Sequence, residues 1–224
     1  MVFFHGYLSS KEAFTAQINY FSRFYRVTAF DFLGFGKSPA IPSAFSVFDY
    51  AQWTIETLNK LGVQTPHVIA HSFGCRVAVK IAKDRSDFFD KILLTGPAGV
   101  VLRRPLSYRI KVAAYRICKR FLPSFAEKNF GSKDYRSLSP IMKESFKKIV
   151  NEDLRQDARQ VENQVLIVEG ERDTTTPLKE ARAYLSCFER GALKRMNGGH
   201  FAFAEYPLAF NLIAEEYFLN GRID

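Results

Sequence analysis

The sequence predicts an α/β fold in which helices cover both faces of a mainly parallel sheet. Short apolar segments rich in β-branched residues recur along the chain, and most are followed by stretches with apolar residues at helical spacing. Glycines and polar residues cluster where those segments end, as at the carboxyl edge of a parallel sheet. Hydrophobic residues form 47% and charged residues 25% of the 224 positions, which is typical of a globular chain with a sizeable core.

Six segments have the composition of strands. Each is a short apolar run that stops at Gly, Pro, Asp, Ser or a similar turn-forming residue. They cover residues 2–5, 26–30, 68–70, 90–95, 164–169 and 192–196.

Helical periodicity links several of these strands. In the first helical stretch, Phe14, Ile18, Phe21 and Tyr25 recur every three or four residues. The predicted helices cover residues 11–24, 47–61, 75–83 and about 203–219.

Residues 101–160 interrupt this alternation, because they contain helical patterns at 106–122, at 140–150 and after Asn151 but no strand pattern. They carry 15 Lys and Arg against six Asp and Glu, whereas the rest of the chain has 17 of each. We predict one domain, 1–224, with 101–160 as a helical lid between the fourth and fifth strands. Its charges either face water or form a basic surface for anionic lipid or an acidic partner.

Composition also narrows the class of protein. No apolar run reaches the ~18 residues that span a bilayer, and residues 1–4 are too short for a secretory signal. Cys75, Cys118 and Cys187 are odd in number and widely spaced, which indicates a reducing cytoplasm without disulfides or a zinc site. No metal or cofactor is expected. The net charge of +9 allows weak contact with anionic surfaces.

The segment 70–74, Ala-His-Ser-Phe-Gly, joins the third strand to the helical pattern at 75–83. A serine on a sharp strand-to-helix turn, with small residues two positions before and after it, forms a nucleophile elbow. Ser72 is therefore a candidate nucleophile. The alternative is that Ser72 is a helix N-cap, which produces a similar sequence pattern. We interpret the neighbouring Cys75 as a small buried residue.

Three more strand ends carry candidate groups. After the first strand, the N–H of Tyr7 in His5-Gly6-Tyr7, together with that of Phe73, could hold an oxyanion; an ordinary turn is the alternative. Asp173 follows the fifth strand, with Glu171 as a second candidate acid. His200 follows the sixth, after two glycines. The order Ser, Asp, His matches one known triad architecture.

These motifs together resemble the α/β-hydrolase superfamily, in particular capped enzymes such as small esterases, haloperoxidase-like enzymes, proline iminopeptidases and carbon–carbon-bond hydrolases. The resemblance covers nearly the whole chain. The motifs that carry it are His5-Gly6, Asp31-x-x-Gly34-x-Gly36-x-Ser38, His71-Ser72-x-Gly74, Gly170-x-x-Asp173 and Gly199-His200.

The resemblance implies the α/β-hydrolase fold with a lid where this chain has its helical insertion. The family's first two strands are absent from the sequence, so we expect six strands with residues 26–30 at the edge of the sheet. Ala70 replaces the glycine usual in the elbow, and one methyl group is tolerable there.

The resemblance also implies a serine hydrolase with Ser72, Asp173 and His200 as its triad and no cofactor. The expected substrate is a small apolar carboxylic ester or related acyl compound, with no nucleic-acid partner. Phe73, Phe201 and Phe203 favour an apolar acyl group. The alternatives are a carbon–carbon-bond hydrolase, an aminopeptidase that binds an amine through lid acids (Glu152, Asp153 and Asp157), and a non-catalytic ligand-binding or signalling protein.

Overall fold

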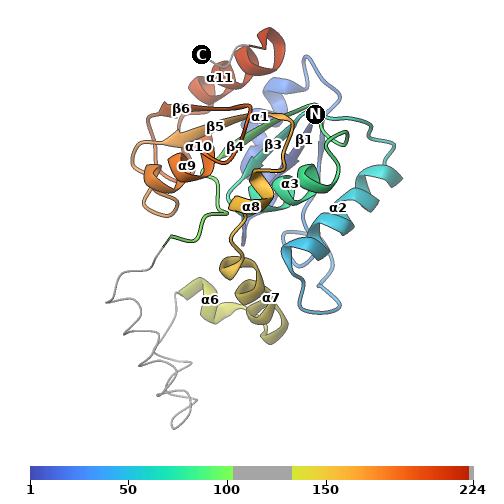
Figure 1. The fold of residues 1–224 in the computed structure, drawn as a ribbon. Helices are drawn as coiled ribbons and strands as arrows, with labels where there is room; N and C mark the ends of the chain where they lie inside the picture. The colour runs from blue at the N-terminus through green and yellow to red at the C-terminus, as the bar shows by residue number, and fades with distance from the viewer. Residues whose placement is uncertain (103–132, 222–224) are drawn as a thin grey trace.

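A computed structural model describes residues 1–102 and 133–221. Its centre is a six-stranded sheet in which all pairings are parallel, in the order β2-β1-β3-β4-β5-β6 (Figure 1). The predicted α/β fold and six-stranded sheet are confirmed. The strands are β1 (Val2–Phe4), β2 (Thr28–Ala29), β3 (Val68–His71), β4 (Lys91–Thr95), β5 (Gln164–Gly170) and β6 (Gly191–Met196).

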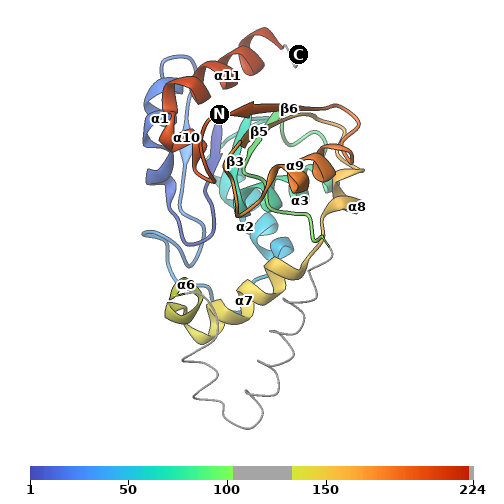
Figure 2. The same cartoon turned by 90° about the vertical axis from the view of Figure 1, so that its left-hand side faces the viewer.

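Helices cover both faces of the sheet, because alternate strand residues point to opposite sides. In β3, Val68 and Ala70 join one core and Ile69 joins the other. The first core packs under α2 (Val47–Lys60), α3 (Phe73–Asp84) and α9 (Leu178–Leu185). The second packs under α1 (Thr15–Phe21), α10 (Ala202–Glu205) and α11 (Pro207–Asn220), which lie together in Figure 2. None of the described helices is long and apolar enough to cross a membrane.

The predicted strand at 26–30 does lie at the edge of the sheet, but it is shorter than expected. Only Thr28 and Ala29 are in β2, and they pair with Val2 and Phe3 of β1. A strand with one neighbour gains ladder hydrogen bonds on one side only, so its ends leave the ladder readily.

Two predicted helices are interrupted. The 11–24 helix begins as a 3-10 turn at Lys11–Phe14 and becomes α1 only from Thr15 to Phe21. The closing helix divides into α10 and α11 at Tyr206 and Pro207. A residue before proline is forced out of the helical region, and Tyr206 accordingly has φ −131° and ψ 63°. The helices α9 and α6 (Lys133–Ser137) were not predicted.

The described part of the 101–160 insertion contains α6, α7 (Pro140–Asn151) and α8 (Arg155–Ala158). The predicted 106–122 helix, and Cys118 with it, lie outside the described residues. Helix α7 is fastened to the body by hydrogen bonds from Ser145 Oγ to the Phe45 carbonyl (2.6 Å) and from Tyr7 Oη to the Met142 carbonyl (3.1 Å). These contacts hold α7 beside the strand ends that carry the candidate site.

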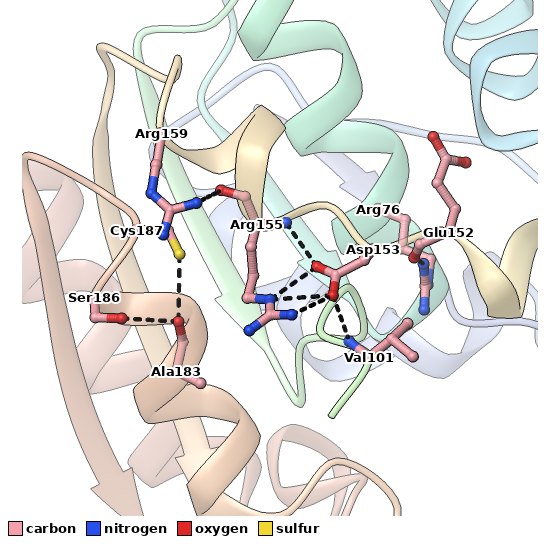
Figure 3. A network of polar contacts seen from close by, with 9 residues as sticks. All are labelled: Arg76, Val101, Glu152, Asp153, Arg155, Arg159, Ala183, Ser186 and Cys187. Carbon is pink, nitrogen blue, oxygen red and sulfur yellow. Dashed lines mark hydrogen bonds and ion pairs between the residues drawn. The ribbon is translucent and has the colours of Figure 1, made fainter. Parts of the chain in front are cut away.

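The two ends of the insertion meet at one place. The Leu154 N–H donates to the Gly99 carbonyl at 2.8 Å, and the Val101 N–H donates to Asp153 Oδ2 at 3.4 Å. Arg155 donates hydrogen bonds from Nε and Nη2 to the same carboxylate, and the one from Nη2 to Oδ2 measures 2.7 Å (Figure 3). We call this group of residues, 99–101 and 153–155, the lid base, after the lid expected from the sequence.

Candidate active site

Ser72 occupies a strained turn between β3 and α3. Its φ of 49° and ψ of −108° are rarely adopted by residues other than glycine, and such strain concentrates at functional sites. Its N–H donates to the Thr95 carbonyl at 3.1 Å, which ties the turn to β4. Its side chain makes no capping hydrogen bond to α3, so the N-cap alternative has no support from the geometry.

Two glycines allow the chain to pass close to this turn. A Cβ on Gly74 would lie 2.3 Å from the Phe4 carbonyl oxygen, so only glycine lets α3 begin against the end of β1. A Cβ on Gly6 would lie 2.8 Å from His71 Nδ1. The turn after β1 and the turn after β3 therefore lie against each other, which brings Tyr7 near Ser72.

His200 and Asp173 form a direct pair. His200 Nδ1 lies 2.7 Å from Asp173 Oδ2, and the carboxyl side chain is fully buried. The pair follows β6 and β5, on the same edge of the sheet as Ser72. His200 Nδ1 donates to the carboxylate, which leaves Nε2 as the ring nitrogen that can accept a proton. No hydrogen bond joins Ser72 Oγ to His200 within the described residues; such contacts often tighten only when substrate binds.

The Asp173 carboxylate is held on every side. Oδ1 accepts the N–H groups of Thr175 (2.7 Å) and Thr176 (2.9 Å), and Oδ2 accepts the Thr176 hydroxyl (2.9 Å) as well as His200. Burial by itself would raise the pKa of Asp173, but the hydrogen bond from His200 and those from the backbone lower it to about 2. The carboxylate is therefore charged at any working pH and fixes the orientation of the imidazole.

Two backbone N–H groups are free to act as an oxyanion hole. Neither the Tyr7 N–H nor the Phe73 N–H has a hydrogen-bond acceptor in the described parts of the chain. The Phe73 N–H stands in the first turn of α3, where helix amides have no internal partner and carry partial positive charge.

Two buried histidines support these turns. The Phe32 N–H donates to His5 Nε2 at 3.0 Å, so Nδ1 carries the proton and donates to the Gly6 carbonyl at 2.8 Å. His71 Nε2 lies 2.9 Å from the His200 carbonyl. Burial, followed by the nearby His200, lowers the pKa of His71 to about 3, so its neutral ring donates from Nε2. Through these hydrogen bonds both imidazole rings stabilise the turns of the site.

Four of the five predicted site residues line one cavity of about 640 Å³. Ser72 and His200 are in its wall, and so are Tyr7 and Phe73. The lining also includes the apolar side chains of Leu102, Leu138, Phe146, Ile149 and Val150. Asp173 stands behind His200 and does not line the cavity. This arrangement places a hydroxyl, an imidazole and two free N–H groups around one apolar space.

Other residues singled out from the sequence lie elsewhere. Glu171 is exposed and pairs with Arg195 at 3.8 Å, so Asp173 is the acid that meets His200. Cys75 is fully buried, as predicted. Phe201 lines the cavity, whereas Phe203 is buried in the core beneath α10 and α11.

The lid acids considered for amine binding are absent from the described cavity wall. Each is bound by a cation instead: Glu152 by Lys80, Asp153 by Arg155, and Asp157 by Lys80 and Lys83. The described residues also contain no group of three or more His, Cys, Asp or Glu side chains that could hold a metal ion.

Sequence reasoning missed three residues of this region. Thr176 bonds the Asp173 carboxylate, and the Asp-x-x-Thr spacing of a turn was a weak signal for it. Arg76 lines the cavity from α3, and Glu169 is fully buried at the end of β5. The sequence alone does not show whether other elements bury a charged residue of a helix or strand.

The parallel sheet with helices on both faces, and the serine on the turn between β3 and α3, are typical of α/β hydrolases. Sequence comparison gives the same result. Residues 1–112 match the α/β hydrolase fold family, and residues 145–224 match a family described as TAP-like protein. The chain belongs to the α/β hydrolase fold family.

Two relatives indicate the breadth of the family. The chain is 29% identical over 92 residues to the (E)-2-((N-methylformamido)methylene)succinate hydrolase of Acinetobacter baylyi, a match that covers 41% of this chain. It is 29% identical over 126 residues, 52% of this chain, to an Arabidopsis thaliana protein named probable lysophospholipase BODYGUARD 3. The matched parts span 35% and 25% of these relatives' lengths.

Solved structures share the fold over a much larger part of the chain. The meta-cleavage product hydrolase of Pseudomonas fluorescens superposes with a TM-score of 0.74 at 22% identity, covering 99% of this chain and 90% of that one. At this identity the likeness concerns the fold alone.

Proposed function

We propose that the protein is a serine hydrolase that cleaves a carboxylic ester or related acyl substrate. The observation that carries the proposal is the 2.7 Å pair of His200 and Asp173 at the wall of a cavity that also contains Ser72 in a strained turn. A serine without a base is a weak nucleophile, and we assign the role of the base to His200.

In this mechanism His200 Nε2 takes the Ser72 proton while Oγ bonds to the acyl carbon. Asp173 keeps the imidazole in the required tautomer and stabilises the imidazolium that forms. The Tyr7 and Phe73 N–H groups hold the oxyanion, each contributing about 3 kcal/mol to lowering the barrier. His200 then protonates the leaving group, and water, activated by the same imidazole, releases the acyl group from Ser72.

The described cavity wall favours a substrate with an apolar acyl portion, because Leu138, Phe146 and Ile149 face the space beside Ser72. The relative named as a lysophospholipase is named for an ester substrate, which supports this reaction class. A carbon–carbon-bond hydrolase on the same residues is the second candidate, because the chain is also 33% identical over 76 residues to a Pseudomonas protein named 2-hydroxy-6-oxononadienedioate/2-hydroxy-6-oxononatrienedioate hydrolase.

The first prediction concerns the nucleophile. Ser72→Ala removes the hydroxyl, so turnover of p-nitrophenyl butyrate should fall by at least about 10⁴-fold. A fluorophosphonate probe should label the wild-type protein on Ser72 and leave the variant unlabelled. Circular dichroism should show the same fold for both proteins. Undiminished turnover in Ser72→Ala contradicts the proposal, and an unlabelled wild-type protein points to a non-catalytic binding role.

A panel separates the two candidate reactions. Esters of increasing acyl length and a vinylogous 1,5-diketone, the substrate type of carbon–carbon hydrolases, are offered to the same preparation. We expect the esters to be turned over with the higher kcat/KM. Preference for the diketone by tenfold or more favours the second candidate.

A further inference from the structure

Arg76 is a buried cation in the wall of the candidate active site. It projects from the first turns of α3, four residues after Ser72, and is only 6% exposed. Its Nη1 donates to the Glu152 carbonyl at 2.7 Å, the one hydrogen bond that its guanidinium makes to described residues. A guanidinium has five N–H donors in a planar fork, so most of its capacity is unused by these partners.

The acids near Arg76 do not neutralise it. The carboxylate of Glu152 binds Lys80 at 2.6 Å, and that of Asp153 is held by Arg155 at 2.7 Å in the lid base (Figure 3). Within the described residues Arg76 has no carboxylate within 4.0 Å. A charge that is both buried and without an ion pair is costly to the fold, and such charges concentrate at functional sites.

The side chain of Arg76 can be reached from the cavity. Arg76 and Gly99 line the same cavity as Ser72, together with apolar side chains such as Leu138, Phe146 and Ile149. Glu180 also lines the cavity, from α9. Glu152 and Asp153, the carboxylates whose charges act on Arg76, are not among the described residues that line the cavity. A ligand in the cavity can therefore reach the guanidinium without displacing a carboxylate of the described residues.

We propose that Arg76 binds a carboxylate of the substrate, so that the enzyme prefers acyl compounds carrying a second, anionic group over their neutral counterparts. This inference rests on the proposed serine hydrolase function. The carboxylate would accept two parallel N–H bonds from the fork, a geometry that lysine cannot reproduce. The apolar wall would hold the chain between that carboxylate and the carbon attacked by Ser72.

Two matched pairs of esters test the preference: p-nitrophenyl hexanoate with the mono-p-nitrophenyl ester of adipic acid, and phenyl hexanoate with 4-carboxyphenyl hexanoate. The charged ester carries its carboxylate on the acyl side in the first pair and on the alcohol side in the second. We expect the wild-type protein to favour one charged ester over its neutral counterpart by at least tenfold in kcat/KM. Arg76→Gln should abolish this ratio, and Arg76→Lys should restore only part of it.

The ratio of kcat/KM for the charged ester to kcat/KM for its neutral counterpart separates carboxylate recognition from a general effect of the substitution on the cavity. Both esters of a pair bind to the same variant protein, so a general effect cancels in the ratio. Arg85→Gln, which removes an exposed cation at the other end of α3, is the matched control and should keep the wild-type ratio. An Arg76→Gln ratio equal to the wild-type ratio for both charged esters overturns the inference while leaving the hydrolase function intact.

A binding measurement does not depend on turnover. Adipate is titrated calorimetrically into Ser72→Ala protein and into the double variant that also carries Arg76→Gln. We expect at least tenfold weaker binding to the double variant. Equal affinities, or no binding to either protein, overturn the inference even if no ester is hydrolysed; the absence of turnover by the wild-type protein would count against the proposed function instead.

Discussion

Glu169 is a carboxyl group whose protonation state at neutral pH is changed by the fold. It is fully buried near the end of β5, and neither carboxyl oxygen has a hydrogen-bond partner among the described residues. Burial, followed by the negative charge of Asp173, raises the pKa of Glu169 to about 9. At neutral pH this side chain is therefore a neutral acid beside the charged Asp173.

This shift predicts a pH-dependent stability. The folded protein keeps the Glu169 proton up to about pH 9, whereas the unfolded chain releases it near 4.5, so the free energy of unfolding falls as pH rises between these values. Glu169→Gln cannot ionise. It should raise the melting temperature by at least about 3 °C at pH 8 and by much less at pH 4.5.

Differential scanning calorimetry at the two pH values checks this expectation. Glu171→Gln, at an exposed carboxyl two residues later, is the control and should leave the melting temperature nearly unchanged at both. A Glu169→Gln effect of the same size at pH 4.5 and pH 8 would show that Glu169 does not titrate as the structure indicates.

At the scale of single residues, the sequence predicted those candidate site residues that follow a strand. Ser72, Asp173 and His200 each follow an apolar run, so their common edge could be predicted. Glu169 and Arg76 could not, because their burial depends on α3, α9 and the lid base, which come from distant parts of the chain. Thr176 was missed for a similar reason: its role exists only once the 173–176 turn closes.

At the scale of elements, the junction between β1 and α3 controls the site. Gly74→Ala would place a methyl group 2.3 Å from the Phe4 carbonyl oxygen, a backbone atom that cannot move aside alone. We expect a loss of about 1–3 kcal/mol in unfolding free energy and a lower kcat, because both N–H groups of the candidate oxyanion hole border this contact.

Urea denaturation and ester kinetics measure the two effects. Gly62→Ala provides the comparison: it also replaces a glycine, at φ 66°, but no atom lies within 4 Å of its new Cβ. It should cost about 1–2 kcal/mol for the left-handed backbone and leave kcat unchanged. A Gly74→Ala protein with wild-type kcat would refute the importance of the junction.

Element boundaries followed the sequence where its local signals were strong. The capping box of Ser46 and Asp49 starts α2, close to the predicted start. At Pro207, where α11 starts, the prediction instead ran one helix across the boundary. The helix α9 was missed because it has eight residues and buries only Ala181 and Tyr184, too few to produce a clear period. The edge strand β2 was overestimated, because its apolar residues continue past the two positions that pair with β1.

At the scale of the molecule, the net charge of +9 is the dominant long-range property. We expect the protein to sediment with vesicles containing phosphatidylserine at low ionic strength and to be released near 1 M salt, where screening acts within about 3 Å. Vesicles of phosphatidylcholine alone are the control. Equal sedimentation with both vesicle types at low salt would exclude an electrostatic surface contact.

The lid base has a consequence for how this protein can diversify. Gly99 and Val101 on one side and Asp153 and Leu154 on the other are bonded directly, so the long segment between them begins and ends at nearly the same point. Extending a loop whose ends are already joined adds little chain entropy, about 0.6 kcal/mol for each doubling of length. We therefore expect changes in the length of this segment to cost the fold little stability, because Ser72, Asp173 and His200 all lie outside it.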